Sequence, residues 1–168
     1  NGMVQNVYDD PEFFAKYSTF RRQVEGLDGA PEWASLRAML PDTHGLRVLD
    51  LGCGFGWFCR WARESGAVSA TGIDLSEKML ARAAEMTNDD RIAYRRDDME
   101  MLELPEGAFD VVYSSLAFHY VVAFERLVRE IWRSLSPGRR LVFSAEHPLY
   151  TAPSRPGWVM DEDGRKTW

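Results

Sequence analysis

Hydrophobic residues recur along this chain in two patterns, short continuous runs and longer segments with helical spacing. The short runs lie at residues 47–51, 68–74, 91–96, 109–114 and 140–145. Most of them are separated by segments in which apolar residues recur every three or four positions. Strands that alternate with helices in this way predict an α/β fold, a doubly wound and mostly parallel sheet with helices on both faces.

The clearest helical pattern spans residues 123–135, with one apolar face and one mostly charged face. The predicted inner face consists of Phe124, Leu127, Val128, Ile131, Trp132 and Leu135. The Ser-Pro-Gly sequence at 136–138 is expected to end this helix, so that the fifth strand begins at Arg140. Two more helices are expected, one over residues 57–65 and one over 76–86 that Ser76 caps.

The first 40 residues are predicted to form short helices. An Asp-Pro-Glu sequence at residues 10–12 favours a helix that runs to about residue 20, and a second helix is expected from Pro31 to about Leu40. The first helix carries more aromatic side chains than a surface helix needs, namely Phe13, Phe14, Tyr17 and Phe20. Two roles are open for this segment and for the preceding Tyr8: packing on the domain core, or a lid over a small-molecule site.

The apolar run at 47–51 leads into three alternating glycines. The sequence Asp50-Leu51-Gly52-Cys53-Gly54-Phe55-Gly56 predicts a buried strand that enters a tight turn and then a helix. Glycines there admit backbone angles, or close approach of a ligand, that a Cβ would block. The helix start adds unpaired N–H groups and a positive dipole end. The spacing departs from the G-x-G-x-x-G dinucleotide fingerprint, which would require glycine at Trp57.

Acidic residues follow the first three predicted strands. Asp50, Asp74 and the pair Asp97 and Asp98 stand at the strand ends, and Asp74 comes 22 residues after Gly52. That separation is typical of an acid on a second strand that reaches a ribose. Because open α/β folds bind ligands at this edge of the sheet, the acids are expected to line one site. They favour a ligand with hydroxyl groups, amino groups and positive charge over a pyrophosphate.

Composition limits the remaining possibilities. A chain of 168 residues with 45% hydrophobic and 27% charged residues fits one globular domain. The formal charge of −6 gives no basic surface for nucleic acid, and no apolar run approaches the roughly 20 residues that span a membrane. Two cysteines, Cys53 and Cys59, are too few for a disulfide framework or a zinc site, and no metal site is expected. We therefore expect a cytoplasmic protein. Asn1 and Gly2, which precede Met3, are expected to be the remainder of a cleaved tag.

The C-terminal residues break the alternating pattern. Residues 147–168 contain several prolines and an acidic turn, which predict loops with at most a hairpin. A sheet that ended at the fifth strand would leave an exposed edge, so either further strands or a second copy of the chain, in a homodimer, should cover it. We expect one domain over residues 3–146 with an N-terminal helical lid at 3–40, and a tail that begins a missing C-terminal part.

These motifs resemble the class I S-adenosylmethionine-dependent methyltransferases, particularly the small-molecule enzymes with a type 11-like domain. The matching segments are Val48–Gly54 with Gly56, Gly72–Ser76, Asp98–Pro105, Phe109–Tyr120 and Leu135–Leu141. Arg139 departs from the pattern, because the family has a second glycine there. The resemblance implies a Rossmann-like fold with two more strands after the fifth, so this chain is expected to lack the last strands.

The resemblance also implies a cofactor and its contacts. S-adenosylmethionine would be bound, with S-adenosylhomocysteine as the product, and the methyl group would pass to a small-molecule acceptor by in-line displacement. The residues expected at the cofactor are Asp50, Gly52, Cys53, Gly54, Gly56, Asp74, Leu75, Asp98, Met99, Ser114, Tyr8 and Tyr17. Within this set, Asp74 would bind the ribose hydroxyls and Asp98 the adenine amino group. Ser114 and Ser115 would meet the methionine part, and Asp50 would orient the glycine turn through backbone hydrogen bonds.

Catalysis needs little beyond alignment and a favourable charge environment. The faces of Tyr8 and Tyr17 could stabilise a sulfonium by roughly 0.5 to 2 kcal/mol. A general base is needed only if the acceptor must lose a proton, and His119, Glu146 and His147 are the candidates because they follow strand ends. For His119 the alternative is a hydrogen-bonded packing residue, which its apolar context favours over a base.

Two other functions are consistent with parts of the pattern. A nicotinamide-dependent oxidoreductase is disfavoured by the glycine spacing. A non-catalytic domain that binds S-adenosylmethionine for regulation would keep the cofactor site and lack methyl transfer.

Overall fold

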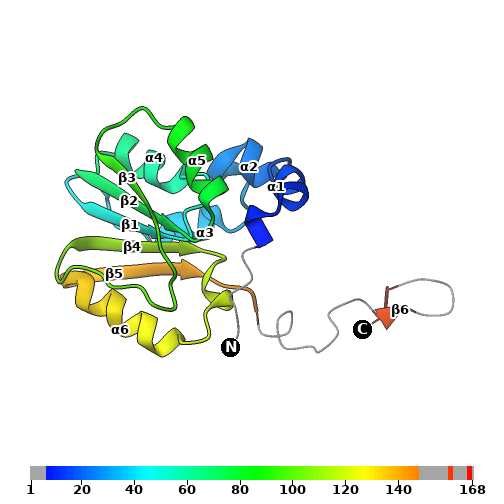
Figure 1. Cartoon of the computed structure of the whole chain (residues 1–168). Coiled ribbons are helices and arrows are strands. Elements are labelled where there is room, and N and C mark those ends of the chain that lie inside the picture. The colour runs from blue at the N-terminus through cyan, green and yellow to red at the C-terminus, as the bar shows by residue number, and fades with distance from the viewer. Residues whose placement is uncertain (1–6, 148–158, 161–165, 168) are drawn as a thin grey trace.

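A central parallel sheet organises the computed structural model, which describes residues 7–147, 159–160 and 166–167 (Figure 1). Its five strands are β1 (Arg47–Leu51), β2 (Ser69–Asp74), β3 (Ile92–Arg96), β4 (Phe109–Ser115) and β5 (Leu135–Ser144). They lie in the order β3-β2-β1-β4-β5, and every neighbouring pair is parallel. The chain order reverses between β1 and β4, which is where doubly wound sheets bind their ligands. The predicted fold class is confirmed.

Helices cover both faces of this sheet. They are α1 (Pro11–Tyr17), α2 (Arg21–Val24), α3 (Trp33–Met39), α4 (Trp57–Glu64), α5 (Glu77–Glu85) and α6 (Phe124–Ser134), with short 3-10 turns η1 (Val7–Asp9), η2 (Gly26–Gly29) and η3 (Phe118–Tyr120). Figure 1 shows α6 on one face of the sheet and α3, α4 and α5 on the other. Because successive residues of a strand point to opposite faces, β1 contributes Val48 to one core and Leu49 to the other.

The predicted caps are present, but the first helix is shorter than expected. Asp10 accepts hydrogen bonds from the backbone N–H groups of Glu12 and Phe13, and the Ser76 hydroxyl accepts one from Met79. The helix predicted to reach residue 20 stops at Tyr17, where the Ser18 hydroxyl donates to the carbonyl of Phe14. Such side-chain bonds compete with the helical ladder. The chain turns there into α2 and η2, neither of which the hydrophobic pattern predicted.

Helix α6 buries a narrower face than its sequence suggested. Leu127 and Ile131 are fully buried, whereas Trp132 is 78% exposed, which corrects its assignment to the inner face. Neighbouring residues of a helix point about 100° apart, so Trp132 cannot share the inward direction of Ile131.

Strand β5 begins five residues earlier than expected. Leu135 follows α6 directly and pairs with Phe109, and the register then shifts before Arg140 pairs with Val111. Gly138 has a positive φ of 76° within this irregular stretch, and the Ser-Pro-Gly sequence forms the irregularity instead of a separate turn. Arg139, where the resemblance led us to expect glycine, pairs with Asp110 at 3.3 Å.

The C-terminal tail contains a two-stranded antiparallel pair, β6 (Val159–Met160) with β7 (Lys166–Thr167), which agrees with the expected hairpin. The remaining tail residues 148–158, 161–165 and 168 lie outside the described residues, as does the expected tag remnant at Asn1 and Gly2. Within the described part of the chain, no helix is both long enough and apolar enough to cross a membrane.

Candidate functional site

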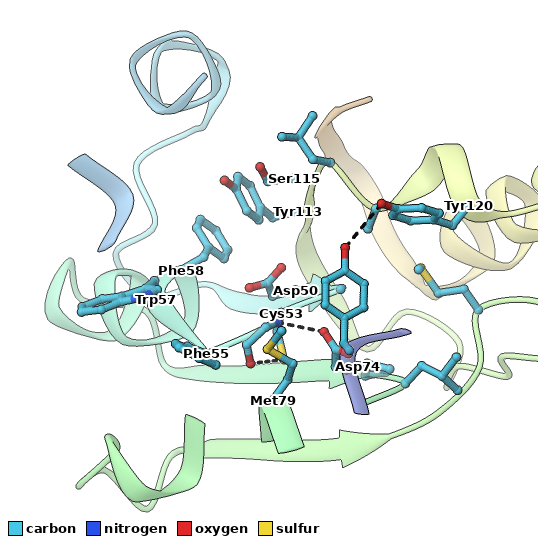
Figure 2. Close-up of a pocket in the computed structure, with 18 of the residues that line it drawn as sticks. Asp50, Cys53, Phe55, Trp57, Phe58, Asp74, Met79, Tyr113, Ser115 and Tyr120 are labelled. Carbon is cyan, nitrogen blue, oxygen red and sulfur yellow. Dashed lines mark hydrogen bonds between the residues drawn. The ribbon is translucent and has the colours of Figure 1, made fainter. Parts of the chain in front are cut away.

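A cavity of about 840 Å³ opens at the carboxyl ends of β1, β2 and β4, beneath the N-terminal helices. Figure 2 shows its lining, with Asp50, Asp74, Ser115 and Tyr120 contributed by four separate segments. Two expectations agree with this position: that the site lies at the carboxyl edge of the sheet, and that the N-terminal helices lie over it. The chemistry of the cavity is set by the side chains and backbone groups that the strand ends and these helices present to it.

Asp74 ties the glycine turn to the start of α5. One carboxylate oxygen accepts from the Gly54 N–H at 2.9 Å, and the other accepts from the Ser76 N–H at 2.9 Å. Gly52, Gly54 and Gly56 all have positive φ, and a Cβ on Gly54 would meet nothing within 4 Å. Burial of the Asp74 carboxylate raises its pKa, although the backbone donors oppose that shift. The turn is therefore shaped by an acid that also faces the cavity.

Asp50 plays a different part from the one expected. Its side chain is 3% exposed, and its one hydrogen-bond partner in the described part of the chain is the Cys59 thiol, at 4.0 Å. Burial, and then the nearby charge of Asp74, raise the pKa of Asp50 well above its usual value. The expectation that Asp50 orients the glycine turn through backbone bonds is wrong, because Asp74 makes that contact and Asp50 lines the cavity wall.

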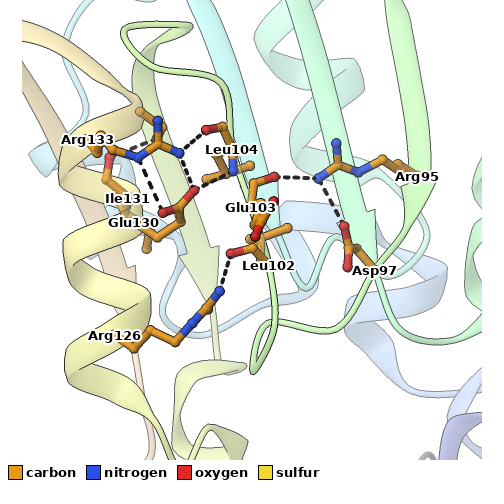
Figure 3. Close-up of polar contacts among 10 residues, drawn as sticks. Arg95, Asp97, Leu102, Glu103, Leu104, Arg126, Glu130, Ile131 and Arg133 are labelled. Atoms are coloured by element: carbon orange, nitrogen blue, oxygen red, sulfur yellow. Dashed lines mark hydrogen bonds and ion pairs between the residues drawn. The ribbon is translucent and has the colours of Figure 1, made fainter.

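The acids after β3 lie on a loop that α6 holds in place. Figure 3 shows Arg126 donating to the Leu102 carbonyl at 2.8 Å and Glu130 accepting from the Leu104 N–H at 2.5 Å. Asp97 pairs with Arg95 at 3.1 Å, while Asp98 accepts from the Glu100 N–H. Asp97, Asp98 and Met99 all line the cavity.

The segment from η1 to η2, residues 7–29, closes one side of the cavity and is called the N-terminal cover. Its Tyr8 hydroxyl lies 3.4 Å from the hydroxyl of Tyr120, and the Tyr8 ring packs edge-on against Tyr17 with centroids 5.1 Å apart. The Asp9 carboxylate accepts from the Ser76 hydroxyl at 2.5 Å. The two roles left open for this segment, packing and covering a site, fall to different residues. Tyr8 and Tyr17 line the cavity, whereas Phe14 packs on Phe55.

His119, in the middle of η3, and Glu146, which follows β5, line the same cavity. The His119 side chain is only 8% exposed, and its Nε2 atom lies 3.9 Å from a Glu146 carboxylate oxygen. Nε2 has no hydrogen-bond partner in the described part of the chain, while Nδ1 accepts a long bond of 3.5 Å from the Glu146 N–H. A buried polar atom without a protein partner is uncommon in folded proteins, so Nε2 is a candidate for a contact with a ligand or an ordered water.

Three of the expected site residues do not line the cavity. The Ser114 hydroxyl is buried and donates to the Leu51 carbonyl at 2.7 Å, so the next residue, Ser115, faces the cavity instead. A Cβ on Gly56 would collide with the Tyr94 hydroxyl, which gives this glycine a packing role between α4 and β3. His147 is not among the lining residues.

An ion pair at the cavity wall was not predicted from the sequence. Arg22 of α2 pairs with Glu32, and both contact the Ser115 hydroxyl. A four-residue helix such as α2 leaves no periodic pattern, so nothing marked Arg22 out from the other arginines. No cluster of potential metal ligands occurs among the residues that the structure describes.

Comparisons with known proteins agree with this geometry. Residues 49–143 match the family described as methyltransferase domain. An S-adenosylmethionine-dependent methyltransferase from Mesorhizobium loti is 60% identical, with a TM-score of 0.78 over 85% of this chain and 65% of its own. Malonyl-[acyl-carrier protein] O-methyltransferase from Pectobacterium atrosepticum is 39% identical over 65% of this chain and 42% of its own length.

A more distant solved structure has the same fold. Phosphoethanolamine N-methyltransferase 2 from Haemonchus contortus, in complex with S-adenosyl-L-methionine, is 25% identical, with a TM-score of 0.73 over 86% of this chain and 36% of its own. The chain thus spans less than two thirds of the length of each of these three relatives.

Proposed function

The chain belongs to the methyltransferase domain family, and we propose that it transfers a methyl group from S-adenosylmethionine to a small-molecule acceptor. The observation that carries the proposal is the Asp74 carboxylate, which shapes the glycine turn and faces the cavity beside Asp50. Oxygen acceptors next to an open glycine turn suit a nucleoside with hydroxyl groups and positive charge better than a pyrophosphate.

The residues of the cavity fit this cofactor. The Asp74 carboxylate accepts from the backbone N–H groups of Gly54 and Ser76, and the Leu75 N–H also lowers its pKa; a carboxylate has about four acceptor positions, so it keeps capacity to accept from the ribose. Asp98 would accept from the adenine amino group, with Met99 and Leu75 beside the ring. Gly54 leaves open space where a Cβ would stand, which allows a ligand to approach the backbone closely. Gly52 and Cys53 would border the methionine part.

When bound, S-adenosylmethionine supplies an electrophilic methyl group on a sulfonium. Tyr8 and Tyr17 would place aromatic faces near that positive charge. With Tyr120 they also cover the cavity and limit access of water. Holding donor and acceptor in line can supply several kcal/mol of the barrier reduction, roughly 7 kcal/mol in favourable cases.

We assign His119 and Glu146 to the acceptor side of the cavity, with different roles. Because Nδ1 of His119 accepts from the Glu146 N–H, the proton of the neutral ring belongs on Nε2, which is then a donor without a partner in the described part of the chain. His119 would thus hold the acceptor by a hydrogen bond, and the Glu146 carboxylate would take a proton where the acceptor must lose one.

The tautomer of His119 can be measured without knowing the acceptor. We expect the ring nitrogen chemical shifts of its neutral form to report the Nε2–H tautomer, with the signals assigned by loss in a His119→Gln variant. His44, which lies outside the cavity, provides the reference for an ordinary histidine in the same spectrum. An Nδ1–H tautomer for His119 would contradict the donor role and restore it as a candidate base.

Calorimetry tests the cofactor directly. We expect the chain to bind S-adenosylmethionine and S-adenosylhomocysteine with micromolar-range affinity, on the order of −8 kcal/mol, and to show no binding of NAD. Binding of NAD alone would reject the methyltransferase proposal in favour of an oxidoreductase. Cofactor binding without methyl transfer to any member of a metabolite panel, measured on the full-length protein, would favour a regulatory domain.

The proposal extends to the setting of the protein. Cys53 and Cys59 are both buried and free, and a protein with free cysteines fits the reducing cytoplasm. In the described part of the chain, β5 pairs only with β4, so its outer edge could support a homodimer. Light scattering of the calorimetry samples tests this, and a monomer would reject the dimer.

A further inference from the structure

Residues 116–123, called the η3 segment, lead from β4 to the start of α6. The segment carries two side chains that line the cavity, His119 and Tyr120. In the proposed function it borders the acceptor, because His119 is assigned to that side. The contacts that hold the η3 segment therefore decide where these two side chains lie.

The η3 segment begins with an unfavourable backbone conformation. Leu116 has a φ of 53°, a left-handed value that residues with a Cβ rarely adopt. Its N–H donates to the Ser144 carbonyl at 3.0 Å, and the buried Phe118 ring packs on Phe143 with centroids 5.2 Å apart. A conformation of this kind persists only where the surroundings hold it. These contacts with β5 hold the beginning of the segment.

The end of the η3 segment is held by Glu100. Its two carboxylate oxygens accept from the N–H groups of Val122 at 2.5 Å and Ala123 at 3.0 Å. Ala123 is the N-cap residue of α6, and its methyl side chain cannot accept a hydrogen bond. A glutamate at the third helical position can reach back to the N-cap N–H, but α6 has Arg126 there. Glu100 takes that role from the loop after β3.

Glu100 belongs to the same turn as Asp98. The Asp98 carboxylate accepts from the Glu100 N–H at 2.9 Å, and the Asp98 carbonyl accepts from the Met101 N–H at 3.0 Å. A further contact ties this loop to α6, since Arg126 donates to the Leu102 carbonyl at 2.8 Å (Figure 3). A shift of Asp98 would therefore move the Glu100 backbone and, through the Glu100 carboxylate, the end of the η3 segment.

We propose that Glu100 is a positioning residue that links the adenine end of the cofactor site to the acceptor side. This rests on the proposed function, in which Asp98 accepts from the adenine amino group. A carboxylate has about four acceptor positions, so Asp98 can make that contact and keep its bond from the Glu100 N–H.

The link acts on two states of the η3 segment. In the closed state, which this structure has, Glu100 accepts from Val122 and Ala123; in the open state both bonds are broken. Adenine bound at Asp98 fixes the turn that carries Glu100, which favours the closed state. The cofactor thus prepares the acceptor side, so that the acceptor binds after it.

Amide hydrogen exchange of residues 117–123 measures how often the η3 segment opens. Adding S-adenosylhomocysteine to wild type should slow this exchange by on the order of 10-fold, a size usual for coupled sites. Adenosine, which lacks the amino acid part, should slow it as well, because the adenine contact carries the effect. In Glu100→Ala the exchange should be faster without ligand and should change by less than about 2-fold when either ligand is added.

The same variant should still bind the ligand. Calorimetry of Glu100→Ala should give an affinity for S-adenosylhomocysteine within about 3-fold of wild type, because Asp74 and Asp98 keep their contacts. If Glu100→Ala unfolds, Glu100→Gln replaces it. Its amide keeps one acceptor for the two N–H groups, so its exchange response should be smaller than that of wild type.

Two further variants separate positioning from helix capping. Ala123→Asp in the Glu100→Ala background gives α6 a cap of its own and should recover most of the loss in the denaturant midpoint. It should not restore the exchange response, because an acid at that position has no bond to Asp98. Glu103→Ala removes an exposed acid of the same loop that lies outside the cavity lining, and it should respond as wild type does.

Four results would overturn the proposal. A response of Glu100→Ala equal to that of wild type would mean that the effect reaches the η3 segment by another route. Recovery of the response by Ala123→Asp would mean that Glu100 only caps α6. A response to S-adenosylhomocysteine without one to bound adenosine would assign the effect to the amino acid part. No response in wild type that binds S-adenosylhomocysteine would mean that the two ends are independent.

Failure of the proposed function would look different from all four. Wild type would then not bind S-adenosylhomocysteine in the calorimeter, whatever the exchange of the η3 segment.

Discussion

Replacing Asp74 by asparagine should weaken binding of S-adenosylhomocysteine by on the order of 100-fold, because two charge-assisted hydrogen bonds to the ribose would become neutral or be lost. The substitution is isosteric, so the side chain can still fill its place between Gly54 and Ser76. One of those two backbone donors would nevertheless face an amide NH₂ group. We therefore expect a loss of about 1 to 2 kcal/mol in unfolding free energy alongside the loss of affinity.

The same residue should make cofactor binding depend on pH. Burial raises the pKa of Asp74, so its carboxylate takes up a proton at a higher pH than an exposed aspartate does. Protonation removes acceptor capacity, and the affinity of wild type should therefore fall as the pH is lowered through that raised pKa. Calorimetry between about pH 5 and about pH 8 measures this, and the Asp74→Asn variant should lack that component of the pH dependence.

A matched variant separates the contact from a general charge effect. Glu77→Gln removes a negative charge from the start of α5, near Asp74, but Glu77 is an exposed partner of Arg96 and does not line the cavity. Its affinity should stay within about 2-fold of wild type. Equal affinity of the Asp74 variant and wild type would take Asp74 out of the binding site.

The local chemistry of the sheet could be predicted from sequence because it is encoded in consecutive residues. The apolar run of β1, the glycines after it and the acid that ends β2 are each constrained by one strand or one turn. Parallel strands bring their ends to one edge, so topology alone placed Asp50, Asp74 and Asp98 around one cavity.

Contacts between distant segments could not be predicted in the same way. Arg22 and Ser115 are 93 positions apart, and their contact depends on how α2 and η2 turn after Tyr17, which no repeat encodes. Strand alternation explains a smaller error. Ser114 and Ser115 point to opposite sides, and sequence could not tell which of the two faces the cavity.

Gly54→Ala should separate cofactor approach from folding. Gly54 has a φ of +51°, so alanine there costs about 1 to 2 kcal/mol in backbone strain, but its Cβ would meet nothing within 4 Å and the chain should still fold. The added methyl group would occupy the open space beside the turn. We expect the affinity for S-adenosylhomocysteine to fall by at least roughly 10-fold, as measured by calorimetry, because close approach to the backbone is blocked.

Two other glycines supply the controls. Gly107 also has a positive φ, +59°, with open space around its Cβ, but it lies away from the cavity, so Gly107→Ala should carry the strain without the loss of affinity. Gly52→Ala would bring its Cβ to 2.5 Å from the Ala117 Cβ and should cost more than about 3 kcal/mol in stability, measured by denaturant unfolding. If Gly54→Ala binds S-adenosylhomocysteine as wild type does, the ligand does not pack against the turn. The acids would then have to define the site without it.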